Sequence, residues 1–183
     1  MSGGHVLAID QGTTNTKAIL VNSFGAVVAK ASAPLKSSYP RPGWAEQSAD
    51  DIWASVQSVI ADIVGAGTFE IAGLAIANQR ETLVFWDAET GTPVAPAILW
   101  QCRRTAKACE ALIASGADPQ VIEATGLSIN ALFPASKLAW VMANVSQAVP
   151  LAAQGRLRAG TVDSWLLYKL TAGAQFATDR SNA

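Results

Sequence analysis

Near its start the chain carries a run of polar residues, Asp10 to Lys17 (DQGTTNTK), with the composition of a phosphate-binding turn. A turn that contains glycine and threonine can present backbone N–H groups and hydroxyl oxygens to phosphate oxygens. Lys17 can add a positive charge, and Asp10 can hold Mg²⁺ through the waters that the metal coordinates. These residues suit a nucleotide phosphate, although a hairpin without function can carry the same residue types.

The two common phosphate-binding fingerprints are missing from the sequence. Neither GxxxxGK[ST] nor GxGxxG occurs in it. A P-loop or a dinucleotide-binding turn therefore cannot explain a phosphate site here. If ATP binds, it binds through another architecture.

A second polar group, residues 78–82 (NQRET), follows the strongly apolar run 71–77. Polar groups at the end of a buried strand are a usual place for a ligand. Arg80 can donate hydrogen bonds to several oxygens and Glu81 can accept them from hydroxyls, so the pair suits a polyol. Neighbouring strand residues point to opposite faces, so both can serve one ligand only if the strand ends or twists there. The alternative is an exposed Arg-Glu turn.

A third group lies at residues 100–105 (WQCRRT). The Trp100 indole can stack on a carbon skeleton or fill the core. Cys102 and Cys109 are seven positions apart, a spacing that fits neither a CxxC redox pair nor a zinc site, so we expect buried free thiols.

The elements that must position these groups begin with strands. Apolar runs separated by turn residues predict an antiparallel meander of strands at 6–9, 17–21 and 26–31. Ser48 is a good N-cap, and apolar residues at helical spacing predict a helix over 48–64. The run 71–77 predicts a strand covered on both faces, with 82–86 as its neighbour.

The rest of the chain is predicted to be mainly helical, after a short strand at 97–100. Apolar residues at helical spacing predict helices over 104–115, 119–125, 136–144 and 161–170. A meander, a crossover helix and a further strand fit a mixed sheet flanked by helices, in the α/β or α+β class.

Composition narrows the classes of partner. The 183 residues are 50% apolar and 15% charged, with a formal net charge of −1, which predicts one compact domain. No Lys/Arg run can follow a nucleic-acid backbone, and no apolar stretch is long enough to span a bilayer. We expect no nucleic-acid or membrane partner and a cytoplasmic location.

Together the motifs resemble the FGGY carbohydrate kinases, and within them the glycerol kinase branch. The blocks that carry the resemblance are DQGTT at 10–14, YPRPGWAEQ at 39–47, NQRET at 78–82, WQCRRTA at 100–106, TGL at 125–127 and GTVDSWLLYKLT at 160–171. The resemblance implies the actin-like ATPase (ribonuclease H-like) fold. It also implies that residues 1–183 form an N-terminal lobe that is incomplete at its C-terminal end, with the C-terminal lobe absent.

The resemblance assigns roles to the polar groups. It places Asp10 near the Mg²⁺-phosphate, in a supporting catalytic role and as a water-mediated Mg²⁺ ligand. It implies that the ATP phosphates are contacted by Gly12, Thr13, Thr14, Asn15 and Lys17. It implies that Arg80 and Glu81 bind the acceptor hydroxyls and that Trp100 lines the pocket.

Three positions depart from the glycerol kinase pattern. Asn15 and Lys17 stand where Ser and Arg are typical, and lysine keeps the charge but loses the bidentate fork. Leu132 stands where a substrate-contacting Tyr is expected, which removes one hydrogen bond worth about 0.5–1.5 kcal/mol.

The implied reaction is transfer of the γ-phosphoryl group of MgATP to a primary hydroxyl, converting glycerol to glycerol 3-phosphate. The base toward that hydroxyl is expected beyond residue 183, so the chain alone is predicted to be inactive, and the full-length protein is expected to be a homo-oligomer. The alternatives are a kinase for another polyol or ketose, such as erythritol, xylulose or ribulose, a non-catalytic actin-like nucleotide-binding protein, or a purely structural interaction domain.

Overall fold

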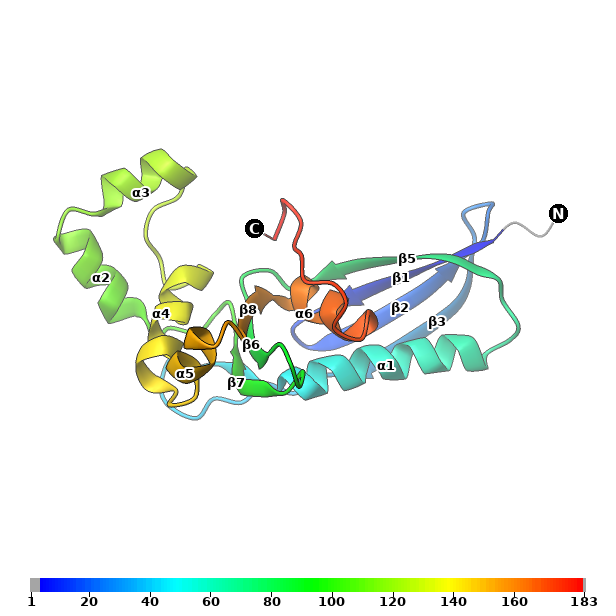
Figure 1. Ribbon diagram of the computed structural model, residues 1–183. Coiled ribbons are helices and arrows are strands. Elements are labelled where there is room, and N and C mark those ends of the chain that lie inside the picture. Colours follow the sequence, from blue (N-terminus) through cyan, green and yellow to red (C-terminus); the bar gives the residue numbers. More distant parts are fainter. Residues whose placement is uncertain (1–3, 183) are drawn as a thin grey trace. The chain divides into compact units, whose positions relative to one another are not determined.

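The computed structural model describes residues 4–182, which divide into two compact units (Figure 1). The first unit contains the chain up to Ser37 together with Ser48–Gln79. The second contains Ser38–Gln47 together with the chain from Arg80 onward. Each unit has its own sheet.

The first unit is built on a mixed sheet. Its strands are β1 (His5–Gln11), β2 (Asn15–Val21), β3 (Val27–Pro34) and β5 (Ile71–Asn78), in the order β3-β2-β1-β5. β1 pairs antiparallel with β2, and β2 with β3, so the predicted meander is confirmed. β5 pairs parallel with β1, which requires the crossover that follows.

The crossover is the helix α1 (Ala49–Gly65), which runs along one face of the sheet (Figure 1). Ser48 accepts a hydrogen bond from the Asp51 backbone N–H at 3.1 Å, so the predicted N-cap is confirmed. The helix buries one stripe against the sheet, formed by Ile52, Val56, Val59 and Ile63. Alternate strand residues, including Leu7, Ile9, Ala18 and Leu20, are buried as well.

The burial predicted for β5 is wrong. The strand exists, but Ile71 and Leu74 are 39% and 43% exposed. β5 is one of the two edge strands of this sheet and, within residues 4–182, has β1 as its single neighbour, while α1 packs against β1, β2 and β3. An apolar run therefore does not by itself show that both faces of a strand are covered.

The second unit has an antiparallel sheet of its own. Its strands are β4 (Glu46–Gln47), β6 (Leu83–Asp87), β7 (Pro93–Ile98) and β8 (Leu157–Thr161), in the order β4-β7-β6-β8. The prediction that 82–86 forms the neighbour of 71–77 is therefore wrong, because β6 pairs with β7 and β8 instead. The chain leaves the first sheet at a turn in which Glu81 has a φ of 64°.

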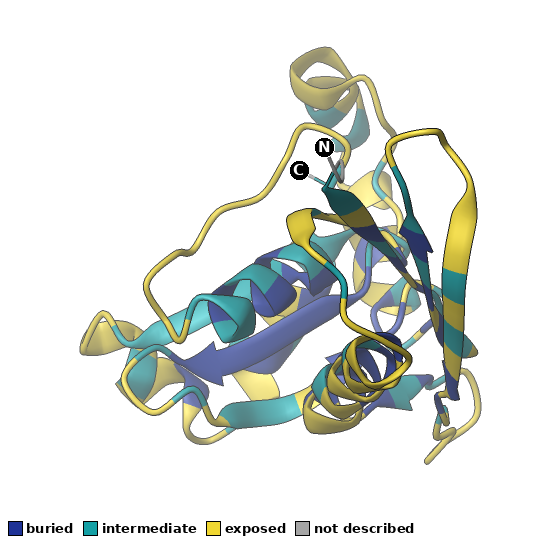
Figure 2. Ribbon diagram, turned by 90° about the vertical axis from the view of Figure 1, so that its right-hand side faces the viewer, coloured by how far each residue is buried: buried dark blue, intermediate teal, exposed yellow. Residues whose placement is uncertain are grey.

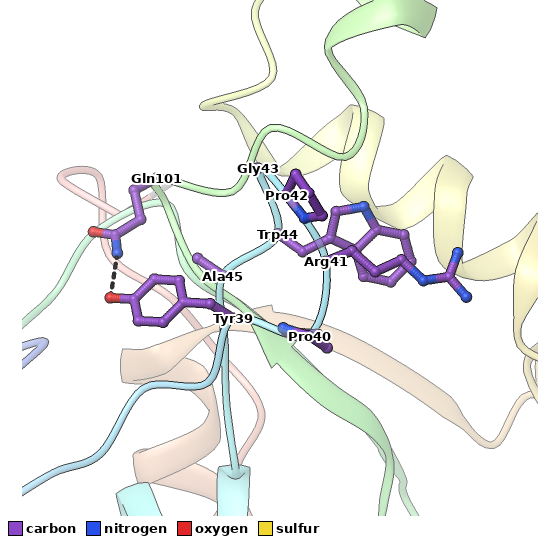
Figure 3. Close-up of a pocket in the computed structure, with 8 residues that line it drawn as sticks. All are labelled: Tyr39, Pro40, Arg41, Pro42, Gly43, Trp44, Ala45 and Gln101. Carbon is purple, nitrogen blue, oxygen red and sulfur yellow. Dashed lines mark hydrogen bonds between the residues drawn. The ribbon is translucent and has the colours of Figure 1, made fainter.

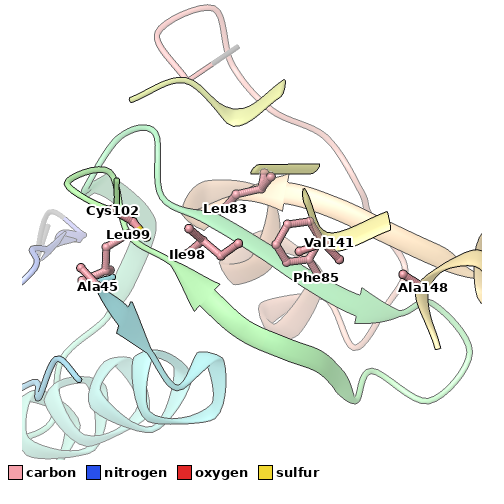
Figure 4. Close-up of a cluster of buried hydrophobic side chains, with 8 residues drawn as sticks. All are labelled: Ala45, Leu83, Phe85, Ile98, Leu99, Cys102, Val141 and Ala148. Atoms are coloured by element: carbon pink, nitrogen blue, oxygen red, sulfur yellow. The ribbon is translucent and has the colours of Figure 1, made fainter. Parts of the chain in front are cut away.

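Strand β6 is the centre of the second unit. All five of its residues are buried, in contrast to the largely exposed β5 (Figure 2). Leu83 and Phe85 of β6 pack in a cluster with Ala45, Ile98, Leu99, Cys102, Val141 and Ala148 (Figure 4). Trp86 packs against Trp165 with ring centroids 5.2 Å apart. Cys102 and Cys109 are buried free thiols, as predicted.

The helices of the second unit are α2 (Ala106–Ala114), α3 (Asp118–Thr125), α4 (Pro134–Asn144), α5 (Ala148–Ala153) and α6 (Val162–Leu170). The four helices predicted in this region are confirmed, whereas α5, β4 and β8 were not predicted. Gly160 in β8 shows why that strand lacks a sequence signal. A Cβ there would lie 2.7 Å from the Ser164 Cβ, so close packing excludes a side chain. Across residues 4–182, no helix has the length and apolar character needed to cross a membrane.

Candidate functional site

The predicted phosphate-binding residues lie on the β1–β2 hairpin of the first unit. Asp10 and Lys17 are cross-strand partners, and both side chains are exposed. Gln11 and Thr16 are the next pair, and both are fully buried on the opposite face. Thr16 is hydrogen-bonded there to Ser55 of α1, with 2.7 Å between the hydroxyl oxygens. One face of the hairpin is therefore anchored to the helix, and the other presents a carboxylate and an ammonium.

The turn between the two strands is tight. The Gly12 backbone N–H donates to the Asn15 carbonyl oxygen at 3.0 Å, and the Leu35 N–H donates to the Thr14 carbonyl at 2.8 Å. A Cβ at Gly12 would lie 3.0 Å from the Asn15 carbonyl oxygen, closer than a side chain tolerates without a backbone shift. Thr14 is exposed and Thr13 half-buried. The turn therefore has fixed backbone geometry with hydroxyl groups near its surface.

The first unit also brings the start of the NQRET motif to this turn. β1 and β5 are parallel and in register, with Gln11 opposite Asn78, so their carboxyl ends meet. The Gln79 backbone N–H donates to the Gln11 carbonyl at 2.8 Å, and the Gln79 side-chain amide donates to Gln11 Oε1 at 3.2 Å. Thr13 donates to Gln79 Oε1 at 3.3 Å. Sequence reasoning did not assign Gln11 and Gln79 this bracing role.

The second half of the same motif begins the second unit. Arg80 is exposed and Glu81 half-buried, and both lie between the end of β5 and the start of β6. The left-handed backbone of Glu81, with φ 64°, is uncommon for a residue with a side chain. β5 thus ends before Arg80 and Glu81. Because these two residues are outside the strand, the alternation of side chains between opposite faces does not prevent both from contacting one ligand.

Trp100 lies just after β7 in the second unit. Its backbone N–H donates to the Thr82 hydroxyl at 3.2 Å, which ties it to the residue that follows Glu81. Its side chain is 42% exposed. The indole therefore does not fill the core, and part of its surface reaches solvent.

Lys137, in the first turn of α4, is a functional candidate that sequence reasoning missed. Its side chain is fully buried, and its ammonium donates to the carbonyl oxygens of Glu81 at 2.5 Å and Leu132 at 2.6 Å. Burial lowers the pKa of Lys137 to about 8, against the opposing effect of the Glu81 carboxylate. The sequence feature that could have identified Lys137 is a lysine among the apolar residues of a short helix.

Titration of Lys137 makes stability depend on pH in a defined direction. Its pKa is about 8 in the native state and has the ordinary value of 10.5 when unfolded, so between these pH values the unfolded chain binds more protons. We expect the free energy of unfolding of the wild-type chain, minus that of Lys137→Met, to increase from about pH 8 to pH 10.5. Urea unfolding at a series of pH values measures this, with the exposed Lys107→Met as control. A difference that is flat or falls with pH would contradict the burial of a charged lysine.

The connection 39–45 forms an open hollow of about 600 Å³ in the second unit (Figure 3). Gln101 donates to the Tyr39 hydroxyl at 3.2 Å across it, and the Arg41 guanidinium lies 4.8 Å from the Trp44 ring centroid. None of the predicted site residues is among those that line it. We therefore do not assign this hollow to the acceptor.

Arg104 anchors this connection to the second unit's core. Its guanidinium is 2.6 Å from Glu46 Oε1, and the two side chains are 2% and 12% exposed. The guanidinium also lies 4.0 Å from the Trp44 ring centroid and 4.7 Å from that of Trp140. The Nε–H donates to Cys102 Sγ at 3.1 Å. Arg104 is thus a structural residue, held in a buried ion pair and packed against two indoles.

The model of the FGGY family of carbohydrate kinases, N-terminal domain, matches residues 5–183. The chain belongs to the FGGY family of carbohydrate kinases. This confirms the resemblance on which the site residues were proposed.

Curated relatives and solved structures agree with this membership. The chain is 47% identical to a glycerol kinase of Symbiobacterium thermophilum over 100% of this chain and 37% of that protein. It is 47% identical to a glycerol kinase of Parabacteroides distasonis over 98% of this chain and 36% of that protein. The chain therefore spans little more than a third of the length of these relatives.

Among solved structures, a Plasmodium falciparum glycerol kinase with ADP matches with a TM-score of 0.94 and 26% identity, over 99% of this chain and 37% of that one. A xylulose kinase of Rhodospirillum rubrum matches with a TM-score of 0.85 and 27% identity, over 98% of this chain and 36% of that one. The predicted α/β, actin-like fold with a mixed sheet flanked by helices is confirmed.

Proposed function

We propose that this chain supplies the phosphate-binding hairpin and the acceptor-binding turn of a glycerol kinase, which transfers the γ-phosphoryl group of MgATP to a primary hydroxyl of glycerol. The observation that carries the proposal is the turn at Arg80 and Glu81, whose backbone is held by Lys137 and lies beside the half-exposed Trp100. Curated relatives named glycerol kinase, at 47% identity over nearly the entire chain, support it.

ATP would bind through the β1–β2 hairpin. The rigid turn at Gly12, the hydroxyls of Thr13 and Thr14, the Asn15 amide and the Lys17 ammonium supply donors of the kind that phosphate oxygens accept. The Plasmodium falciparum relative was solved with ADP, which supports a nucleotide here.

Magnesium would lie at Asp10. Mg²⁺ keeps several waters and is held by one or two carboxylates together with substrate phosphates. The exposed Asp10 carboxylate at the end of β1, beside a hairpin suited to phosphates, fits that requirement. The ion would neutralise charge on the transferring group, and Asp10 would orient its waters.

The acceptor would be bound by complementary hydrogen-bonding groups. The Arg80 guanidinium donates only and the Glu81 carboxylate accepts only, so together they can fix both the oxygens and the protons of neighbouring hydroxyls. The Trp100 face would cover the carbon skeleton. Because phosphoryl transfer depends mainly on positioning and charge stabilisation, these contacts would contribute to rate as well as to affinity.

A second candidate acceptor is a larger polyol or a ketose. Leu132 stands where glycerol kinases are expected to carry a Tyr, and its side chain is half-buried in the segment held by Lys137. The likeness to a Rhodospirillum rubrum xylulose kinase points in the same direction. The cytoplasmic location and homo-oligomeric state expected above stay predictions.

The test is an ATP-consumption assay on a kinase of the relatives' full length that carries these 183 residues, called the full-length kinase below. The acceptors are glycerol, erythritol, xylulose and ribulose. We expect the largest kcat/KM with glycerol, and a further gain with glycerol in Leu132→Tyr. A larger value with another acceptor would transfer the proposal to that substrate, and folded protein that consumes ATP with none of them would overturn it.

A further inference from the structure

We propose that Lys137 is a positioning residue of the acceptor site, whose ammonium joins the backbone carbonyls of Glu81 and Leu132 and thereby sets where the Glu81 carboxylate meets the acceptor hydroxyls. The inference rests on the proposed function, because it assumes that Glu81 binds the acceptor. Lys137 itself would not touch the acceptor.

The contacts of Lys137 are unusual for a lysine. Its side chain is fully buried, and its ammonium donates hydrogen bonds to two backbone carbonyl oxygens, at 2.5 and 2.6 Å, rather than to a carboxylate. A buried ammonium is costly unless it is well hydrogen-bonded. Such a group fixes the relative position of the segments that it joins, since moving either would leave the charge unsatisfied.

The segment that Lys137 holds needs support. Glu81 has a φ of 64°. This left-handed conformation is unfavourable for a residue with a Cβ, and it is kept only where surrounding contacts stabilise it. The ammonium binds the carbonyl of this same residue. The conformation that ends the strand at the motif is thus stabilised by a bond from α4.

The two segments that the Lys137 clamp joins, α4 and the chain after Glu81, are each held by further hydrogen bonds; the clamp is the pair of hydrogen bonds from the Lys137 ammonium to the Glu81 and Leu132 carbonyls. On α4, the Ser136 hydroxyl lies 2.9 Å from that of the buried Thr105. Beyond Glu81, the Thr82 hydroxyl accepts the Trp100 backbone N–H at 3.2 Å. Lys137 therefore completes a frame in the second unit that holds the proposed carboxylate and indole of the acceptor site in one arrangement.

Leu132 gives the clamp a consequence for specificity. The second carbonyl on the ammonium belongs to Leu132, and the Leu132 N–H donates to Asn130 Oδ1 at 2.9 Å. The backbone at position 132 is thereby held at a set distance from that of Glu81. The side chain at 132, whether Leu or the Tyr expected in glycerol kinases, would face the acceptor from a place that Lys137 determines.

The proposed role of Lys137 can also be tested through the pH dependence of the KM for the acceptor. Burial lowers the pKa of Lys137 to about 8, against the raising effects of Glu81 and Cys102, and the Arg104 guanidinium also lowers it. Above that pH the ammonium loses its proton, and the charge-assisted bonds to the carbonyls weaken. The KM for the acceptor should then rise above about pH 8, and this rise should be missing when residue 137 cannot titrate.

The experiment uses the full-length kinase and its Lys137→Met and Lys137→Gln variants, with Lys107→Met as the exposed control. We expect kcat/KM for the acceptor to fall about a hundredfold in both variants, because misplacing a positioning group by about 1 Å can cost that much. The KM for ATP should stay unchanged, and the rise of the acceptor KM at alkaline pH should disappear. The wild-type pH profile and Lys137→Gln carry the test if Lys137→Met does not fold.

Three results would overturn the inference. An unchanged kcat/KM for the acceptor in a folded variant would show that Lys137 does not position Glu81. A parallel fall in the kinetics for ATP and acceptor, tracking a lower melting temperature, would show a merely structural role. An alkaline rise of KM that persists in the variants would assign it to another group. Failure of the wild-type kinase to phosphorylate any acceptor would instead contradict the proposed function.

Discussion

Replacing Arg80 by alanine in the full-length kinase is expected to lower kcat/KM for glycerol by about 10²- to 10³-fold, with little change in the KM for ATP. The exposed guanidinium lies in the turn beside Glu81, in the second unit, whereas the hairpin proposed to bind the ATP phosphates is in the first. A charge-assisted hydrogen bond contributes about 1.5–3 kcal/mol, and about 1.4 kcal/mol corresponds to a tenfold change in rate. Loss of two such bonds to hydroxyls, each near the lower end of that range and together worth about 3–4 kcal/mol, gives the expected fall.

The matched measurements separate binding from folding. Lys107→Ala removes an exposed cation from α2 and should leave kcat/KM unchanged. Arg80→Lys keeps the charge but not the planar fork, so it should recover only part of the activity. Near-wild-type kcat/KM in a folded Arg80→Ala variant would remove Arg80 from the acceptor site.

Replacing Arg104 by methionine should destabilise the chain by about 3–5 kcal/mol, because breaking a buried ion pair leaves an uncompensated charge. That charge is the Glu46 carboxylate, whose side chain is only 12% exposed. The change also removes the cation that lies over the Trp44 and Trp140 rings. The free energy of urea unfolding measures the loss.

Two controls identify the cause of the loss. Arg103→Met alters the exposed neighbouring residue and should cost less than about 0.5 kcal/mol. Adding Glu46→Gln to Arg104→Met removes the orphaned charge and should restore part of the stability. Equal unfolding free energies for Arg103→Met and Arg104→Met would show that the buried pair contributes nothing.

The strands and helices that the sequence predicts correctly are those whose signal is local. The meander follows from apolar runs with turn residues between them, and α1 from Ser48 and its apolar stripe. The β1–β2 hairpin, which is proposed to bind phosphate, and the Arg80-Glu81 turn also lie at strand ends, as their motifs predicted. Turn chemistry, capping and periodicity act over a few residues, so one sequence is enough to find them.

The features that the sequence does not predict depend on contacts between distant segments. The apolar run 71–77 predicts a strand that is covered on both faces. Nothing in the neighbouring sequence shows that this strand lies at the edge of its sheet. β8 is a strand because β6 pairs with it, and its own residues, including Gly160, give little signal. Lys137 gains its role only when Glu81, far away in the sequence, is folded against it. Such features require the tertiary structure.

We propose above that this chain carries the hairpin and the acceptor turn of a glycerol kinase. The most direct test is glycerol-dependent formation of ADP by the full-length kinase, with the product identified by phosphorus NMR. We expect ADP and glycerol phosphate to form in equal amounts, and only when ATP and glycerol are both present. Folded protein that binds ATP but forms no glycerol phosphate would contradict the claim. ADP formation with another polyol or a ketose would then favour the second candidate acceptor, and no ADP with any acceptor would favour a non-catalytic nucleotide-binding protein.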